Sequence, residues 1–131
     1  MGLKLTPKPG EKIAVNGAVI LNGDRRAEFV VENHAQVLRE RDIMRAEEAT
    51  TPARRVYIPV MMMALDPANR VQAFPEFEQR LTELAGVLSD QRALALCLKI
   101  SAAVANTAYY RALGHCRALI DFENERLSDV A

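Results

Sequence analysis

The segment Glu47–Pro67, EEATTPARRVYIPVMMMALDP, decides the fold because the chain changes character within it. Thr51 before Pro52 is typical of a helix N-cap followed by proline at the first helical position. The run from Val56 to Leu65 is almost wholly apolar, so a helix here is expected to be buried. Asp66-Pro67 should end that helix, since the residue before a proline avoids helical backbone angles. The segment therefore predicts the first helix of the chain.

Pro59 lies inside this apolar run and leaves two interpretations open. Within a helix, a proline removes one hydrogen bond and costs about 3 kcal/mol or more. One interpretation is a strand over Arg55–Ile58 followed by a helix from Pro59. The other, which we favour, is a kinked or late-starting helix. The three methionines that follow, Met61 to Met63, are interpreted first as core residues that fill gaps, and second as an adaptable surface for a partner.

Residues 1–50, before the segment, predict short strands and tight turns. Asn16-Gly17 separates two short apolar runs, which is the strongest short-range signal for a β-hairpin. A second turn is expected at Asn22-Gly23. The predicted strands are Leu3–Leu5, Ile13–Val15, Ala18–Leu21, Phe29–Val31 and a short one beginning at Val37. Strands this short, with turns at close intervals, favour a small antiparallel β-barrel or meander.

Residues 51–131, from the start of the segment's helix onward, predict helices. Three further stretches carry apolar residues at helical spacing, from Phe74 to Leu88, from Leu94 to Ala105 and from Tyr109 to Leu127. Ser89-Asp90 supplies a stop and a new cap. Short connections favour an antiparallel bundle or hairpin. The sequence thus predicts an α+β protein, with a β-rich N-terminal part and a helical C-terminal part in one compact domain.

Composition narrows the function. The chain has 131 residues, with 17 Lys+Arg against 17 Asp+Glu, so its formal net charge is zero. This weighs against nucleic-acid binding by bulk charge, although a local basic patch is compatible with it. Aromatic residues make up 5% and Trp is absent, which counts against a base-stacking platform. The apolar run is shorter than the ~20 residues that cross a bilayer, and no signal-peptide pattern opens the chain. We therefore expect a cytoplasmic protein that does not bind membranes.

The sequence contains no arrangement typical of catalysis. It has no glycine-rich phosphate loop, no nucleophile elbow, no CxxC pair and no histidines at helical spacing. Cys97 and Cys116 fall in apolar helical patterns and are interpreted as buried thiols. We expect a protein that is not an enzyme and that holds neither a metal nor a cofactor.

Two kinds of surface are candidates for binding. Arg25-Arg26 lies on a turn, where a solvated hairpin tip is the first interpretation and a phosphate contact the second. Arg39, Arg41 and Arg45 extend the basic residues, but acidic residues interleave with them. A two-sided apolar helix, with Leu96 and Ile100 on its second stripe, would need a further partner. The candidate residues for a protein interface are Met61, Met62, Leu96, Ile100 and Tyr110.

Several motifs in fixed order resemble the FlbT family of flagellar biosynthesis regulators from alphaproteobacteria. They are Leu5–Lys12 (LTPKPGEK), Val15–Arg26 with its VNGAVI and NGDRR pieces, Leu38–Met44 (LRERDIM), Glu47–Tyr57 (EEATTPARRVY) and Leu65–Pro67 (LDP). The resemblance covers essentially the whole chain, and it is sharper in the first half.

The resemblance implies post-transcriptional control of flagellin. Members of the family are associated with the 5′ untranslated region of flagellin mRNA and limit its translation or lifetime, and some act as activators. The first candidates for RNA contact are then Arg25, Arg26, Arg54 and Arg55, and the second are Arg39, Arg41 and Arg45, all chosen for their charge. The alternative is a protein-binding module that docks flagellin or a flagellin chaperone and regulates synthesis indirectly. A homo-oligomer is compatible with either.

Overall fold

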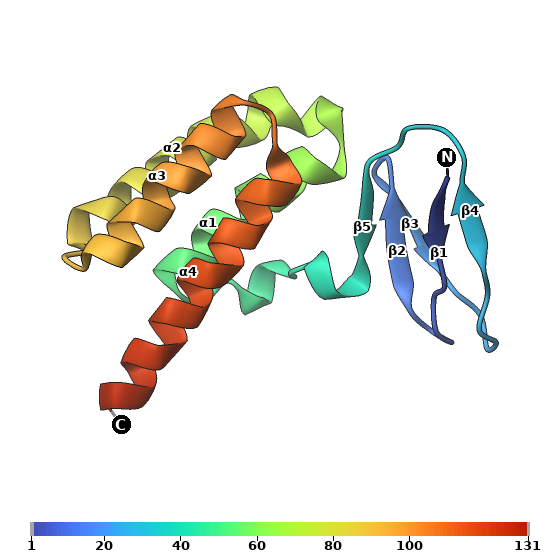
Figure 1. The fold of residues 1–131 in the computed structure, drawn as a ribbon, viewed down its shortest axis with the longest axis horizontal. Coiled ribbons are helices and arrows are strands. Elements are labelled where there is room, and N and C mark those ends of the chain that lie inside the picture. The colour runs from blue at the N-terminus through green and yellow to red at the C-terminus, as the bar shows by residue number, and fades with distance from the viewer. Residues whose placement is uncertain (1, 131) are drawn as a thin grey trace.

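The computed structural model describes residues 2–130, with side chains described for residues 2–126. Within this range five short strands come first and four α-helices follow. The strands gather in one part of the molecule and the helices in another, and the two parts lie side by side along the long axis (Figure 1). The predicted α+β class is therefore confirmed.

The strands form two antiparallel sheets. The three-stranded sheet has the order β3-β2-β5, and the two-stranded sheet pairs β1 with β4. The strands are β1 (Leu3–Leu5), β2 (Lys12–Val15), β3 (Ala18–Leu21), β4 (Phe29–Val31) and β5 (Val37–Arg39). The strands are where the sequence predicts them, but they do not close into a barrel. Pro7 and Pro9 lie between β1 and β2, and because proline has no N–H donor this segment belongs to neither sheet.

The predicted turn at Asn16-Gly17 joins β2 to β3. Both residues have positive φ, 50° for Asn16 and 87° for Gly17, as a two-residue hairpin turn requires. The turn also faces the helical part, because a Cβ atom added at Gly17 would lie 2.8 Å from Oδ2 of Asp66. This turn is thus one point where the two parts of the molecule meet.

Two short 3-10 helices, η1 (Glu40–Asp42) and η2 (Ala46–Glu48), lead to α1 (Pro52–Leu65). The hydroxyl oxygen of Thr51 accepts a 3.3 Å hydrogen bond from the backbone N–H of Arg54, which confirms the predicted N-cap. The helix is continuous through the buried Pro59, so neither the strand at Arg55–Ile58 nor a late start occurs. The helix ends before Asp66, as predicted.

After η3 (Pro67–Asn69) come α2 (Arg70–Val87), α3 (Gln91–Ala105) and α4 (Tyr109–Val130). Helix α1 packs against α2 and α4, and α4 packs against α3, whereas α2 and α3 make few contacts with each other. Asp90 caps α3, with its Oδ1 accepting a 2.8 Å hydrogen bond from the N–H of Arg92. The helices therefore pack in the order α2-α1-α4-α3, and α2 and α3 face each other across a hollow.

One buried cluster connects the helices with the sheet. Ala14 of β2 and Leu38 of β5 belong to the same cluster as Met63, Ile100 and Leu113 from the helices. Both cysteines are free and buried, which confirms their interpretation as buried thiols. The side chain of Leu127, the last residue of the predicted C-terminal helical stretch, lies outside the described residues. No helix in the described chain combines the length and hydropathy that a bilayer crossing needs.

Candidate nucleic-acid interface

A hollow of about 510 Å³ lies in the β part, between β1, β2, β5 and η1. Leu5 and Ile13 form its apolar base, and both are almost fully buried. The charged side chains that line it are Lys4, Lys8, Glu11, Arg39 and Arg41. Four cations thus surround one carboxylate, in a chain whose formal net charge is zero. This is the local basic patch that composition alone left open.

Strand pairing brings these cations together from distant points of the sequence. Arg39 ends β5, which pairs with β2 so that Arg39 lies opposite Ile13. Lys4 lies in the middle of β1, and Lys8 follows in the turn toward β2. Arg41 comes from η1, directly after β5. The sequence separates Lys4 from Arg41 by more than 30 residues, so their proximity depends on the sheets.

Most of these cations are not neutralised by neighbours. Lys4 is the exception, with its Nζ 3.6 Å from Oε1 of Glu28 in an exposed ion pair. Glu11 accepts a 2.8 Å hydrogen bond from the backbone N–H of Lys8. Arg39 and Arg41 take part in no ion pair or side-chain hydrogen bond with any other described residue. Their guanidinium groups can therefore bind an anion such as a phosphate, which matches their planar fork.

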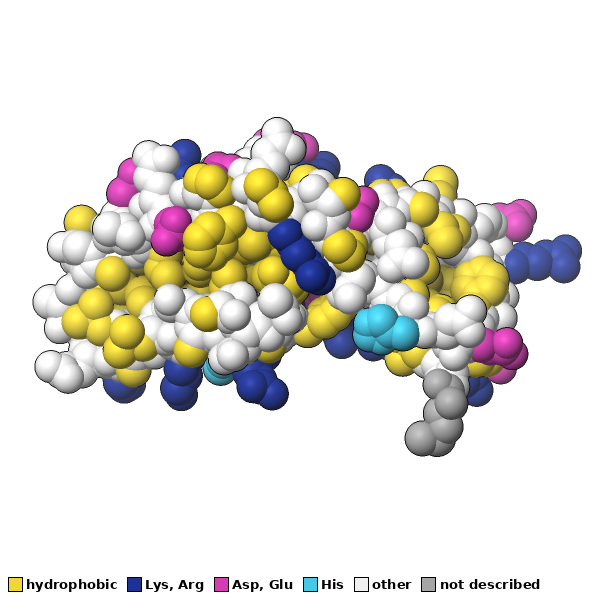
Figure 2. Space-filling model, turned by 90° about the horizontal axis from the view of Figure 1, so that it is seen from above, with side chains coloured by type: hydrophobic (Ala, Val, Ile, Leu, Met, Phe, Trp, Pro, Cys, Tyr) yellow, Lys and Arg dark blue, Asp and Glu magenta, His cyan; other side chains and the backbone are white. Residues whose placement is uncertain are grey.

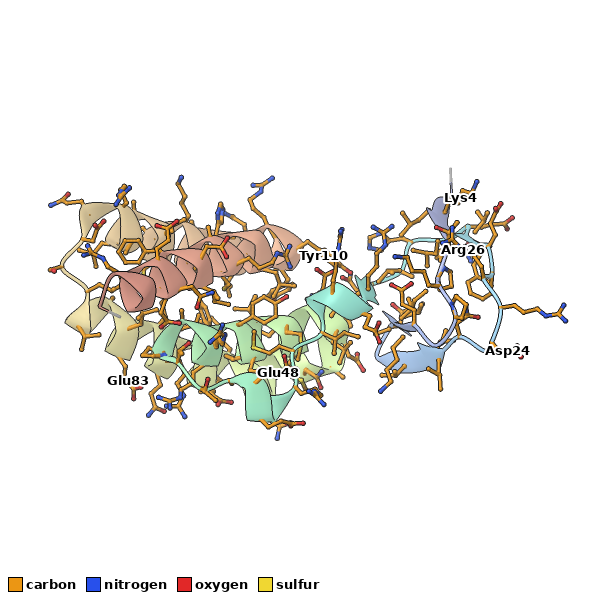
Figure 3. All side chains as sticks on the ribbon, turned by 90° about the horizontal axis from the view of Figure 1, so that it is seen from below. Lys4, Asp24, Arg26, Glu48, Glu83 and Tyr110 are labelled. Atoms are coloured by element: carbon orange, nitrogen blue, oxygen red, sulfur yellow. The ribbon has the colours of Figure 1, made fainter. Side chains whose placement is uncertain are left out.

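Arg25 and Arg26 lie on the exposed loop between β3 and β4, which is hydrogen-bonded to Pro7 and Lys8 in the lining of this hollow. The side-chain amide of Asn22 fixes that loop, donating hydrogen bonds of 2.8 Å to the carbonyls of both Lys8 and Arg25. The backbone N–H of Gly10 adds a 2.9 Å bond to the carbonyl of Gly23. In Figure 3, Lys4 and Arg26 lie at the same end of the molecule, away from Glu48 and Glu83.

The other predicted arginines lie elsewhere. Arg54 and Arg55 are in the first turn of α1, and Nη2 of Arg54 lies 3.4 Å from Oδ1 of Asn124 on α4. Because the β2–β3 turn meets α1 at its other end, beside Asp66, these arginines lie about 18 Å along the helix from that contact. The seven candidate arginines therefore do not form one continuous surface.

Arg45 is already paired. Its Nε lies 3.0 Å from Oε1 of Glu48, and its Nη1 lies 3.6 Å from Oε1 of Glu47. The hydrogen bond to Arg45 lowers the pKa of the Glu48 carboxyl, and the same contact raises the pKa of the Arg45 guanidinium. Arg45 thus carries its charge next to two carboxylates, where little of it is left for a ligand.

The candidate residues for a protein interface differ in how far they are buried. Met61 and Ile100 are 7% and 0% exposed and pack in the core, and the sulfur of Met61 accepts a 3.1 Å hydrogen bond from the N–H of Met44. Met62 and Leu96 are partly buried. Tyr110 is 44% exposed and lines a hollow of about 280 Å³ at the junction of the two parts, together with Leu3 and Val37.

Sequence reasoning missed Lys4 and Lys8 in the basic hollow, and it missed several strongly exposed apolar residues. Leu98 is 73% exposed on α3, and all four residues of β3 are exposed. Alternation of Lys4 with Leu3 and Leu5 indicates that Lys4 points away from the buried side, but only the pairing of β1 shows what it faces. No cluster of three or more His, Cys, Asp or Glu suited to a metal occurs among the described residues.

The fold and its basic hollow define the class of this molecule, a small α+β protein whose strand-built end carries clustered cations beside a helical bundle. Comparison with known proteins gives the family. The family model described as "Flagellar protein FlbT" matches residues 3–127, and the chain belongs to this family. No solved structure matches the chain.

Three relatives illustrate the similarity. The chain is 53% identical to the probable flagellum biosynthesis repressor protein FlbT of Caulobacter sp. (strain K31) over 131 residues, which is all of both chains. It is 50% identical to the flagellum biosynthesis repressor protein FlbT of Caulobacter vibrioides (strain ATCC 19089 / CIP 103742 / CB 15), over all of this chain and 93% of that one. It is 33% identical to a probable FlbT repressor of Brucella abortus (strain 2308), over 94% of this chain and 80% of that one.

Proposed function

We propose that this protein represses flagellum biosynthesis after transcription, in the cytoplasm, by associating with the 5′ untranslated region of flagellin mRNA. Binding there would repress translation of the message or promote its degradation. The family membership and the names of the relatives support the flagellar role. The observation that supports RNA as the ligand is the hollow in which Arg39 and Arg41 lie beside Lys4 and Lys8.

The hollow suits phosphate better than it suits a base. Its cations lie above an apolar floor formed by Leu5 and Ile13. Its lining contains no aromatic side chain on which a nucleobase would stack. Arginine and lysine contacts to phosphate position a nucleic acid without reading its sequence. Selectivity for one leader would then depend on the shape of the folded RNA, which places its backbone against the hollow and the Arg25–Arg26 loop.

The test is direct binding of the purified chain to a flagellin 5′ leader RNA, followed by fluorescence anisotropy at fixed salt. Arg41→Glu is expected to weaken binding at least tenfold, because it replaces a phosphate contact with a repulsion. Lys99→Glu, on the exposed face of α3, is the matched control, since it changes the net charge equally. A scrambled RNA of the same length measures selectivity. Equal loss in both variants, or no binding by the unaltered chain, would refute the RNA site.

A second candidate function is favoured by a different observation. Between α2 and α3 lies a partly apolar hollow of about 160 Å³, lined by Phe74, Phe77, Glu78, Leu81 and Thr82 of α2 and by Ser101 and Ala105 of α3. Figure 2 shows hydrophobic side chains in a hollow over the helical part. A surface of this kind suits the apolar face of a partner's helix. The alternative is therefore a module that docks flagellin or a flagellin chaperone and regulates flagellin synthesis indirectly.

The two candidates respond differently to substitution. Phe74→Glu, at a residue 40% exposed beside the hollow, should abolish capture of flagellin or its chaperone and leave RNA binding unchanged. Val71→Glu is the control on the same helix, because Val71 is 88% exposed and does not line the hollow. The salt dependence of binding also distinguishes the two candidate functions, since contacts to RNA phosphates weaken steeply as the salt concentration rises. Capture of neither protein by the unaltered chain would eliminate the second candidate.

A further inference from the structure

The outer edge of β3 has no partner in the described chain. Strand β3 pairs only with β2, in a three-stranded sheet that ends at β3. All four of its residues are exposed although all are apolar, with Val19 60%, Ile20 46% and Leu21 64% exposed. Proteins usually protect such edges with charges, prolines or bulges. Strand β3, with the sequence AVIL in a regular register, has none of these.

The register fixes which backbone groups point outward. Because Asn16-Gly17 is a two-residue turn, Val15 and Ala18 form a hydrogen-bonded pair, and pairs alternate from there. Ile13 and Ile20 are the next such pair, and the 2.9 Å bond from the N–H of Asn22 to the carbonyl of Glu11 continues the series. The N–H and C=O groups of Val19 and Leu21 therefore face away from β2, toward the open edge.

We propose that this edge pairs with β3 of a second copy of the chain, antiparallel across a two-fold axis. With Val19 opposite Leu21 of the second copy, both outward-facing residues of each strand enter hydrogen-bonded pairs, which gives four backbone hydrogen bonds. Ile20 then lies on the axis opposite its own copy, in a non-hydrogen-bonded pair where side chains approach most closely. The two three-stranded sheets become one sheet of six strands.

A second copy fits this edge because the strand complements itself. Neither strand carries a charge, so pairing leaves no charged side chain against Val19 or Leu21. The formal net charge of zero means that two copies do not repel each other as whole molecules. A two-fold contact uses the same surface on both copies and leaves no edge of β3 open. Assembly should therefore stop at the dimer.

The dimer should be weak. Each copy contributes a strand of four residues, whereas a stable interface buries about 20 or more residues on each side. We expect a monomer–dimer equilibrium with a Kd of the order of 10 µM or above, which sedimentation equilibrium over a range of concentrations detects. A single mass at every concentration, either monomer or larger than dimer, would refute the proposal.

Two variants test whether β3 is the contact. Val19→Lys introduces a charge facing its own copy, and Leu21→Pro removes an outward N–H while leaving the bonds to β2 intact. Each should weaken dimerisation at least tenfold. Val71→Lys is the control, at an equally apolar but more exposed residue on α2. Circular dichroism verifies that each variant keeps its fold. Dimerisation that survives both strand variants would place the contact elsewhere and overturn the proposal.

A separate experiment tests the proposed register between the two copies of β3. Ile20→Cys places two thiols across the axis, at a spacing that a disulfide spans. Mild oxidation should convert this variant to a covalent dimer, whereas Val71→Cys should remain monomeric. Cys97 and Cys116 are buried and do not compete. Failure of Ile20→Cys to cross-link, with a dimer present, would refute the register. Because none of these measurements involves RNA or flagellin, the outcome is independent of the proposed function.

Discussion

Arg117 of α4 donates a 2.9 Å hydrogen bond to the carboxylate of Asp42, which lies 75 residues earlier in η1. The hydroxyl of Tyr57 on α1 completes the contact. It donates a 2.8 Å bond to the backbone carbonyl of Asp42 and accepts a 3.2 Å bond from Arg117. Three elements are thus joined where the chain passes from the sheet to the helices, and η1 carries Arg41 of the basic hollow.

This contact predicts coupled losses of stability. Tyr57→Phe should lower the free energy of unfolding by about 1 kcal/mol, because the phenol makes two hydrogen bonds in a mostly buried position. Arg117→Ala should cost about as much or less, since Arg117 is half exposed. Because the two side chains share a bond, the double variant should lose less than the sum of the single losses. Urea unfolding of all four proteins measures this.

The control for this cycle is Arg111→Ala, an exposed arginine on the same helix, which should change stability by less than about 0.5 kcal/mol. Losses that add without coupling would contradict a shared network.

The turn at Gly17 predicts a larger loss of stability than the Tyr57 contact does. Gly17 has φ of 87°, and an added Cβ would approach Asp66 to 2.8 Å. Gly17→Ala should therefore lower the free energy of unfolding by about 1–3 kcal/mol, through backbone strain and displacement of Asp66. Gly114→Ala is the matched control. Gly114 lies within α4 with open space around its Cβ position, so alanine there should stabilise the protein by up to about 1 kcal/mol. Thermal unfolding compares the two, and similar Tm changes of the same sign would disprove the argument.

Local signals in the sequence predicted the helices and strands well. They did not predict the contacts between residues that are distant in the sequence. Asn16-Gly17, Thr51-Pro52 and Asp66-Pro67 act within a few residues, and each lies where the sequence indicates. The pairing of β1 with β4 depends instead on a strand about 25 residues away. The sequence pattern therefore does not distinguish a closed barrel from two separate sheets.

The candidate site shows the same limit. Charge alone ranked Arg54 and Arg55 with Arg25 and Arg26, because periodicity does not show which parts of a helix and a sheet face each other. The charge pattern of the sequence also could not show that Glu47 and Glu48 neutralise Arg45 while Arg39 and Arg41 stay unpaired in the described chain. Met61 and Ile100 lie on apolar stripes that a partner or the core would cover equally well, and here the core covers them.

The Cys116 thiol predicts a pH dependence. Burial raises its pKa from 9.0 to about 12. Above pH 9 the unfolded chain loses this proton while the folded protein retains it, so folding stability falls as pH rises, by about 1 kcal/mol per unit up to about pH 12. Below pH 9 the contribution is complete and constant. Burial raises the pKa of Tyr57 in the same direction, so part of the alkaline loss belongs to that residue.

Cys116→Ala isolates the contribution of the thiol. At pH 8 the variant should be less stable than the unaltered protein, by about 1–2 kcal/mol, because it loses buried contacts. The difference should shrink as pH rises above 9, since only the unaltered protein must keep the thiol protonated. Urea unfolding at several pH values provides both curves. A difference that stays constant with pH would show that the thiol does not titrate as its burial requires.

The last prediction concerns which arginines contact RNA, and it depends on the proposed function. Each lost phosphate contact lowers the steepness of the plot of log affinity against log salt, by about 0.7 for single-stranded nucleic acid. Arg26→Ala should produce a change of this size, because Arg26 is exposed on the loop beside the hollow and makes no ion pair within the described chain. Arg45→Ala should leave the slope nearly unchanged, since Glu47 and Glu48 already neutralise Arg45. Anisotropy titrations of the leader RNA at four salt concentrations measure both slopes, and a larger change for Arg45 than for Arg26 would move the RNA interface from the β part to the connection between η1 and α1.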